Sequence, residues 1–329
     1  YQQLEDYFYN KKGSNYMDDR ALLLAKIATM YYLDNLSQQE ISNIVKISRP
    51  TVSRALMEAR EKGIVEITIH SPIPRVYKLE QKIMEKYSLD EAVIVPVLSL
   101  QDDNILKSLG DAAAYYLYEN AKDNMTIGFS MGKTLDQMAN SLKNHSINKN
   151  INLNVVPIVG GAGYQAPHLH ANDICRRVAE VFGGEFFPIY VPAIAENEKK
   201  KLDFMSEPLV NKVFEMSLNA DIIFVSVGKV DSSTFLKIGS IDESETNNLI
   251  KQGIIGDIGS WFFDENGNFP NIEINKSIVG LNFSKLRKNS KVILVAGTEP
   301  KKEVIKSALK GGWVDTLITD EDVCKYLLQ

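Results

Sequence analysis

The stretch from Ser37 to Gly63, SQQEISNIVKISRPTVSRALMEAREKG, predicts two short helices joined by a tight turn. Ser37 and Glu40 form a capping box, in which each side chain satisfies a free backbone amide of the other residue. Ser48 is a good N-cap for the second helix, and Pro50 is tolerated in the first turn of that helix. The two helices are therefore expected to begin close to these serines.

A further helix is expected just before this stretch, over Asp19–Leu33. Apolar residues recur there every three or four positions, which is the spacing of one helical face. The predicted apolar stripe consists of Leu22, Leu23, Ile27, Met30 and Tyr31. Three helices at this spacing indicate a helix-turn-helix domain.

The outer face of the last helix is the predicted DNA-binding surface. At 100° per residue, Val52, Ala55, Leu56 and Ala59 share the side that packs on the other two helices. The opposite side carries arginines that can reach guanine edges or phosphates. The residues predicted to contact DNA are Ser37, Gln38, Ser48, Arg49, Pro50, Thr51, Ser53, Arg54 and Arg60. The alternating run Ile64–Ile69 predicts a strand, which indicates the winged form of the domain.

Charge alone does not establish DNA binding. From Met17 to His70, seven Lys and Arg are balanced by seven Asp and Glu, and the whole chain has a formal net charge of -5. Such a balance excludes a general polyanion binder, because non-specific affinity grows with the number of phosphates neutralised. A purely structural helical module is the alternative. The helix spacing and the basic outer face favour DNA binding.

The composition predicts a folded protein of two unequal domains. At 329 residues, with 44% hydrophobic and 24% charged residues, the chain exceeds one ordinary core and has no signature of disorder. The prolines in Ser71–Pro74 break the preceding strand pattern. We therefore expect a helix-turn-helix domain over 17–70, a linker with a connector helix over 71–90, and a larger domain over 91–329.

The same composition indicates a cytoplasmic location. The chain has no signal-peptide pattern and no apolar run near the roughly 18 residues of a spanning helix. Cys175 and Cys324 match neither a disulfide framework nor a metal-ligand spacing, and we expect both to be buried.

From Glu91 onward, short β-branched runs alternate with helical patterns. This alternation predicts a doubly wound α/β fold with mostly parallel strands. In such folds, ligands bind at the carboxyl ends of the strands. The predicted strands are 92–98, 125–129, 153–159, 186–191, 221–227, 277–281, 291–296 and 315–319.

Two glycine-rich loops follow predicted strands. The run Gly128–Thr134 resembles a nucleotide P-loop, but only three residues separate its glycines where the P-loop has four, so we exclude ATP. A turn of this kind still offers backbone amides, Ser130 and Thr134 hydroxyls and the ammonium of Lys133 to a phosphate monoester. The loop from Gly160 to Tyr164, with Gly161 and Gly163, would let the backbone approach a sugar. Simple turn chemistry is the alternative for each loop.

Further polar residues lie near other predicted strand ends. Gly228 follows one strand, Asp257 could accept hydrogen bonds from sugar hydroxyls, and Lys301 could balance a phosphate. His168 and His170 have no third ligand at a recognisable spacing, so no metal is expected. No cofactor is expected either.

Four motifs together carry a family resemblance that covers about Asp19 to Leu328. They are IGFSMGKTL (127–135), PIVGG (157–161), GDIGSWFFDENG (256–267) and VAGTEPKKEVIKSALKGGWVDTLITDE (295–321). The sequence resembles the SorC-type (SorC/DeoR) regulators, which pair a helix-turn-helix with an effector domain similar to glucosamine-6-phosphate deaminase and its isomerase relatives. One departure is Thr298, which stands where that family often has a second glycine after Gly297.

The resemblance implies a transcription regulator of a carbohydrate-utilisation operon, and it implies that this regulator acts as a repressor. Its implied partners are operator DNA, a phosphorylated sugar at the sheet ends, and copies of itself in a dimer or a tetramer built as a dimer of dimers. The ligand positions that the resemblance implies are the Gly128–Thr134 loop with Gly132, Gly160, Gly161, Asn172, Asp257 and Lys301.

The alternative from another class is an active phosphosugar isomerase or deaminase. Such an enzyme needs a base and an acid positioned in one pocket. His168, His170, Asp173 and Asp257 are available, but their spacing matches no recognisable catalytic arrangement. The attached helix-turn-helix favours sensing, and no catalytic residue is predicted.

Overall fold

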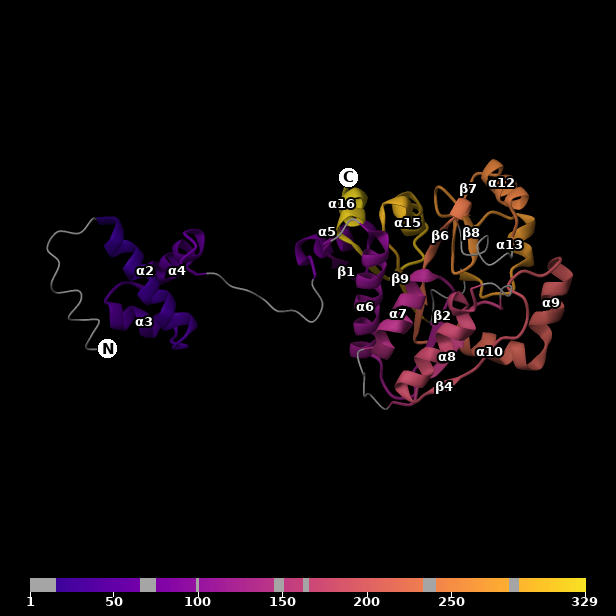
Figure 1. Cartoon of the computed structure of the whole chain (residues 1–329), viewed down its shortest axis with the longest axis horizontal. Helices are drawn as coiled ribbons and strands as arrows, with labels where there is room; N and C mark the ends of the chain where they lie inside the picture. Colours follow the sequence, from indigo (N-terminus) through magenta and orange to yellow (C-terminus); the bar gives the residue numbers. More distant parts are fainter. Residues whose placement is uncertain are drawn as a thin grey trace. The chain divides into compact units, whose positions relative to one another are not determined.

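The computed structural model of the chain describes residues 16–65, 75–98, 101–144, 151–161, 166–232, 241–283 and 290–329. The chain divides into two compact units, Tyr1–His70 and Ser71–Gln329 (Figure 1). Each unit has its own hydrophobic core.

The described residues of the first unit form three helices: α2 (Tyr16–Tyr32), α3 (Gln38–Val45) and α4 (Arg49–Glu61). The predicted caps are confirmed. Ser37 Oγ accepts a hydrogen bond from the Glu40 backbone N–H at 3.3 Å, and the Glu40 carboxylate accepts one from the Ser37 N–H at 2.8 Å. Ser48 Oγ accepts from the Thr51 N–H at 3.3 Å, which starts α4.

The core of the first unit joins one face of each helix. The predicted stripe of α4 is confirmed, because Val52, Ala55, Leu56 and Ala59 are all buried. On α2, Leu24, Ile27, Ala28 and Met30 are buried, whereas Leu22 is 42% exposed. The expectation that Leu22 packs inward is wrong. Residues that are two positions apart in a helix point about 200° away from each other around its axis, so burying Leu24 turns Leu22 outward. Most of the predicted wing strand, from residue 66, lies outside the described residues.

The second unit is built on a parallel sheet of seven strands, which confirms the predicted α/β fold. The strand order is β1-β10-β9-β5-β2-β3-β4, and every neighbouring pair is parallel. The strands are β1 (Glu91–Val95), β2 (Thr126–Phe129), β3 (Asn154–Pro157), β4 (Glu185–Phe186), β5 (Ile222–Val225), β9 (Lys291–Val295) and β10 (Thr316–Asp320).

Helices cover both faces of this sheet (Figure 1). One hydrophobic cluster joins the sheet to α6 (Asp102–Asn120), α7 (Lys133–Asn144) and α8 (Ala171–Phe182). The other joins it to α5 (Tyr77–Tyr87), α10 (Pro208–Leu218), α15 (Lys302–Lys310) and α16 (Glu321–Leu328). Val93 and Val95 enter the first cluster and Ile94 the second, because successive strand residues point to opposite faces. Further helices of this unit are α9 (Glu198–Ser206), α12 (Glu243–Lys251) and α13 (Glu273–Ser277).

Part of the segment expected to be a linker belongs to the second unit. Helix α5 packs on β1 and α16. Arg75 donates to both carboxylate oxygens of the buried Glu80 at 2.9 Å, and Glu80 also accepts a hydrogen bond from the Ile94 backbone N–H. These bonds fix the helix on the edge strand of the sheet.

Two predicted strands, 186–191 and 277–281, are mostly or wholly absent from the central sheet, and one small sheet was not predicted. The run 186–191 continues past β4 without strand pairing, and 277–281 contributes only isolated bridges. An antiparallel sheet forms instead from β6 (Val227–Lys229), β7 (Ile254–Ile258) and β8 (Trp261–Asp264). The turn between β7 and β8 is Gly259-Ser260, with φ of +53° and +81°. Two successive positive φ values are typical of tight hairpin turns.

Both cysteines are buried and free, as predicted. Burial raises the pKa of the Cys324 thiol to about 12. In the described part of the chain, none of the helices combines the length and apolar character that crossing a bilayer requires.

Candidate functional site

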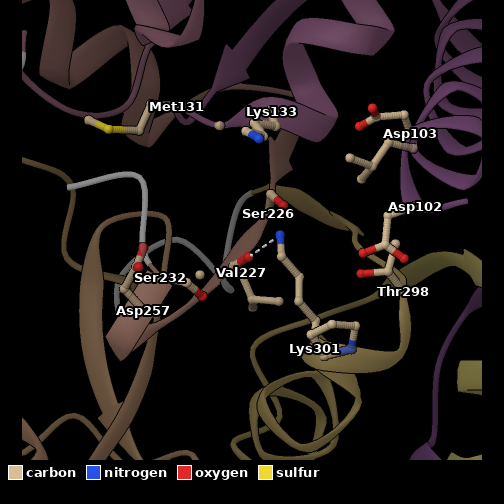
Figure 2. Close-up of a pocket in the computed structure, with 14 residues that line it drawn as sticks. Asp102, Asp103, Met131, Lys133, Ser226, Val227, Ser232, Asp257, Thr298 and Lys301 are labelled. Atoms are coloured by element: carbon tan, nitrogen blue, oxygen red, sulfur yellow. Dashed lines mark hydrogen bonds between the residues drawn. The ribbon is translucent and has the colours of Figure 1, made fainter. Parts of the chain in front are cut away.

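A pocket of about 390 Å³ lies where the carboxyl ends of β2, β5 and β9 meet the small sheet (Figure 2). The loop after β2 contributes Met131–Lys133, and the chain after β5 contributes Ser226–Gly228. The turn after β9 contributes Thr298, Pro300 and Lys301. The other lining residues are Asp102, Asp103, Leu106, Ser232 and Asp257. This is the edge of the sheet at which parallel α/β folds bind ligands.

Two lysines supply positive charge to the pocket. Lys133 is exposed and is the first residue of α7, where the helix dipole and the free first-turn N–H groups also attract anions. The Lys301 side chain rises into the centre of the pocket, where its Nζ donates to the Val227 carbonyl at 2.9 Å (Figure 2). The pocket therefore favours a ligand with an anionic group.

Asp257 is the buried acid of the pocket. Figure 2 shows Asp257 and Ser232 on one side of Lys301, with Asp102 and Thr298 on the other. Burial raises the pKa of Asp257 to about 7, although Lys301 and a hydrogen bond from the Ser260 backbone N–H oppose this rise. Near neutral pH, the carboxyl group can therefore be present in both forms, and it can donate to or accept from a hydroxyl.

The turn that carries Lys301 is held by a second buried acid. Asp320, at the end of β10, accepts a hydrogen bond from the Thr298 backbone N–H at 2.7 Å. Thr298 has φ +77° and ψ 146°, a conformation that favours glycine. A Cβ at Gly297 would lie 2.3 Å from the Asp320 carboxylate, so this position has no room for a side chain. Thr298 thus occupies a strained backbone position in the pocket wall.

Five of the predicted ligand residues line this one pocket: Gly132, Lys133, Gly228, Asp257 and Lys301. Gly228 and Asp257 lie opposite each other on β6 and β7, not in loops as expected. The Gly132 N–H already donates to the Leu169 carbonyl at 3.0 Å, so it is not one of the free amides. Gly132 has φ +141°, which explains the need for glycine there.

Three residues of the predicted phosphate loop lie behind the pocket. Gly128 is inside β2, where a Cβ would lie about 3 Å from Ile158 and Ile223 side-chain atoms. The buried Ser130 hydroxyl donates to the Met131 carbonyl at 3.3 Å. Thr134 is fully buried, and its hydroxyl has no hydrogen-bond partner among the described residues. The expectation that these groups face a ligand fails because β2 continues to Phe129 and α7 begins only at Lys133.

The second predicted loop also packs away from this pocket. Gly160 lies against residues 191–192, and a Cβ there would meet the Pro192 carbonyl oxygen at 2.5 Å. The Gly161 N–H donates to the Val191 carbonyl at 2.8 Å. Both halves of the Asn172 amide are bonded to the backbone of Ile189, at 2.8 and 3.1 Å. Gly163 lies outside the described residues.

Several lining residues were not predicted. A usable signal existed for Asp102 and Asp103, because they begin the helix that follows the first strand. The same signal existed for Ser226, which follows β5 directly. No comparable signal marks Leu106, Val227, Ser232 or Pro300, whereas Met131 falls inside the predicted Gly128–Thr134 loop. Thr298 was noted only as a departure from the resembled family.

The outer face of α4 in the first unit has the predicted arrangement. Arg49, Pro50 and Arg54 are exposed, and neither arginine has an acidic partner among the described residues. Arg60 differs, because it donates to the Tyr32 hydroxyl at 2.9 Å and so fastens α4 to α2. Arg20 and Glu58 add an ion pair at 2.5 Å between the same two helices.

Of the four acid–base candidates considered for an enzyme, only Asp257 lines the pocket. Asp173 is bound to Arg176 at 2.8 Å and to Arg177 at 2.9 Å. Within the described ranges, the side chains of His, Cys, Asp and Glu form no group that could hold a metal ion.

Comparisons with known proteins match both units. Residues 71–329 match the family model described as "Putative sugar-binding domain", and residues 20–81 match the Crp-like helix-turn-helix domain. The chain is 31% identical over 313 residues to the deoxyribonucleoside regulator of Bacillus subtilis, covering 94% of this chain and 98% of that protein. It is 27% identical to the sorbitol operon regulator of Klebsiella pneumoniae, covering 94% and 99%.

Solved structures agree with these matches. The full-length sorbitol operon regulator SorC from Klebsiella pneumoniae has a TM-score of 0.70 at 26% identity, covering 96% of this chain and all of that one. The sugar-binding domain of a transcriptional repressor from Vibrio fischeri has a TM-score of 0.69 at 25% identity, covering 77% and 98%.

The two neighbouring glycines of the 160–161 turn provide a test of the backbone packing. Gly160→Ala should destabilise the protein by about 1–3 kcal/mol, because its Cβ would overlap backbone atoms that have no room to move. Gly161→Ala is the matched control, since its Cβ would be in ordinary contact at 3.7 Å. Urea unfolding of both variants measures the difference, and equal destabilisation would contradict the packing described here.

The raised pKa of Asp257 predicts a pH-dependent stability. Because the folded-state pKa of about 7 lies above the usual value of 3.8, the folded protein holds a proton that the unfolded chain releases, so stability falls as pH rises from about 4 to 7. Asp257→Asn removes this loss. Relative to the unsubstituted protein, the variant should gain about 2.5 kcal/mol in unfolding free energy between pH 5 and pH 8, since the two pH units from 5 to the folded-state pKa each contribute about 1.4 kcal/mol. Urea unfolding at both pH values tests this, with Asp103→Asn, an exposed acid of the same pocket, as the control. A stability difference that is the same at both pH values would refute the assignment.

Proposed function

Because this chain belongs to the SorC-type family of sugar-responsive transcription regulators, we propose that its second unit senses a phosphorylated sugar in the pocket of Figure 2. Binding there would control how the first unit binds operator DNA. The chain is a transcription regulator, and its relatives carry the names of regulators, which favours this function over a phosphosugar isomerase or deaminase.

The observation that supports a phosphorylated ligand is the distribution of charge in the pocket. Lys133 and the start of α7 make one anion-attracting group, and Lys301 makes a second. A phosphate can accept several charge-assisted hydrogen bonds at once from a lysine and from free helix amides. We place the phosphate beside Lys133.

The rest of the pocket suits hydroxyl groups. Asp102 and Asp103 are exposed at its mouth, and Asp257 is buried in its wall. Carboxylates repel a phosphate but accept hydrogen bonds from sugar hydroxyls. We therefore propose that these acids hold the sugar and keep its phosphate at the Lys133 end.

The sense of regulation and the assembly are also proposals. One structural neighbour is named a transcriptional repressor, and we propose repression for this chain. An operator with two half-sites requires two recognition helices related by a two-fold axis, so we propose a dimer or a tetramer. We place the protein in the cytoplasm, where operator DNA lies.

The first test compares sugar phosphates with their unphosphorylated parents by calorimetry. The names of two relatives mention sorbitol and deoxyribonucleosides, so the first pairs to compare are sorbitol 6-phosphate with sorbitol, and deoxyribose 5-phosphate with deoxyribose. At least one phosphate should bind, and its parent should bind about 10–100-fold more weakly, since each charge-assisted hydrogen bond contributes about 1.5–3 kcal/mol. Lys133→Gln should weaken binding of the phosphate to a similar extent.

Lys143→Gln, an exposed lysine in the last turn of the same helix, is the control and should bind normally. Gly132→Val is less suitable, because φ of +141° already strains any residue with a side chain. Equal affinity for a sugar and its phosphate, or normal binding by Lys133→Gln, would overturn the proposed phosphate position.

The second test concerns the outer face of α4. Arg54→Ala should weaken binding to DNA selected by the protein from a random pool, by about 1–3 kcal/mol if Arg54 contacts a base. If Arg54 contacts a phosphate, the slope of log affinity against log salt concentration should instead become smaller in magnitude by about one. Fluorescence anisotropy at several salt concentrations separates the two. Lys26 is an exposed lysine on α2, and Lys26→Ala is the control. Unchanged affinity of the Arg54 variant would refute the assignment of the outer face of α4 to DNA binding.

A further inference from the structure

A second pocket, of about 510 Å³, lies in the same unit between α9, the chain from β8 to α13, and the end of α15. It shares no lining residue with the first pocket. Figure 1 shows α9 and α13 at the edge of the unit farthest from β1 and α6. Both pockets fall within the range of roughly 300–1,000 Å³ that is usual for small-molecule sites.

Aromatic rings form one wall of this second pocket. Phe269 lies between Trp261 and Trp313, with ring centroids 6.1 and 4.9 Å apart, and all three side chains are half-buried. The chain has two tryptophans, and both line this pocket. Aromatic faces carry partial negative charge and pack well against the C–H face of a ring. Among the described residues, no aromatic side chain lines the first pocket, so the described walls of the two pockets suit different ligand surfaces.

Lys201 gives the second pocket a half-buried positive charge. Its Nζ lies 5.1 Å from the centroid of the Trp261 ring, and burial lowers its pKa. Three other partly buried cations of this unit have carboxylate partners: Arg75 with Glu80, Arg177 with Asp136, and Lys291 with Glu91. Among the described residues, Lys201 makes no ion pair within 4 Å. Glu198, an exposed carboxylate on the same helix that also lines this pocket, acts on Lys201 without such a contact and opposes the fall of its pKa. A half-buried ammonium that no carboxylate contacts directly favours an anion.

Side-chain amides complete the site. Asn268 and Asn271 are exposed at the pocket, and the Asn268 amide donates a hydrogen bond of 3.3 Å to the Asp264 carboxylate. Amides offer both donors and acceptors, which matches the two-way hydrogen bonding of hydroxyl groups. Lys276, which also lines this pocket, forms an ion pair with Glu273 at 2.6 Å.

We propose that this second pocket binds a hydroxylated ring that carries an anionic group, with the ring on the tryptophans and the anion on Lys201. This site is separate from the effector pocket and does not depend on the function proposed for it. A carboxylate and a phosphate share the required chemistry, and the experiment below distinguishes them.

The two tryptophans make the site directly observable in the full-length protein. Glucuronate, glucose 6-phosphate and glucose are titrated while tryptophan emission is recorded. At least one of the two anions should change the emission with saturation, and glucose should bind at least about tenfold more weakly, since it lacks the group that contacts Lys201. A response to glucuronate alone assigns the anion as a carboxylate, and a response to glucose 6-phosphate alone assigns it as a phosphate.

Variants then locate the response. Lys201→Gln should weaken it at least tenfold, Lys201→Arg should retain it, and Lys199→Gln, on the exposed surface of the same helix, should leave it unchanged. Lys133→Gln should also leave it unchanged, because Lys133 belongs to the first pocket. Thermal unfolding checks that each variant is folded.

Three results would overturn the proposal. In the first, neither anion changes the emission. In the second, Lys201→Gln retains the response while Lys133→Gln loses it, which would assign the signal to the first pocket. In the third, emission without ligand changes with protein concentration in parallel with sedimentation, which would make this face a contact between subunits.

Discussion

The parallel pairing of the central strands is the constraint on which the effector pocket depends. Because β5 pairs in parallel with both β2 and β9, their three carboxyl ends reach the same edge of the sheet. Lys133 follows β2, Gly228 follows β5 and Lys301 follows β9, and all three line the pocket although they are far apart in sequence. The anion-attracting groups of the pocket therefore come together through strand register, and not through any local motif.

A second constraint fixes how Lys301 enters the pocket. Asp320 is almost fully buried, and its two oxygens accept hydrogen bonds from Thr298 on one side and from the first turn of α16 on the other. Burial raises the pKa of Asp320, while these backbone donors oppose the rise. The same carboxylate thus holds the strained turn after β9 and the last helix of the chain. A buried carboxylate with several donors stabilises its surroundings best when every donor is kept in place.

The sequence predicted those features that depend on local periodicity, and it missed those that depend on where a strand ends. The caps at Ser37 and Ser48 and the buried stripe of α4 follow from spacing within one helix, and the structure confirms them. Gly128 ends up inside β2, as the predicted strand 125–129 implied, and its expected part in the phosphate loop fails because its lack of a side chain serves close packing within the sheet. Asp257 was expected in a loop, although Gly259-Ser260 between two apolar runs is itself a two-residue hairpin signal. Ser232 and Pro300 reach the pocket only through tertiary structure, which periodicity does not report.

The β7–β8 hairpin gives the two pockets a shared wall. Asp257 lines the first pocket from β7, and Trp261, four residues later, lines the second from β8. Ile258 pairs with Trp261 across the hairpin, and the Ser260 N–H that closes its turn donates to Asp257. A ligand that changes the protonation or position of Asp257 therefore acts on the same turn that sets the position of Trp261. Any coupling through this hairpin must be reciprocal, because binding free energies at two linked sites change each other by the same amount.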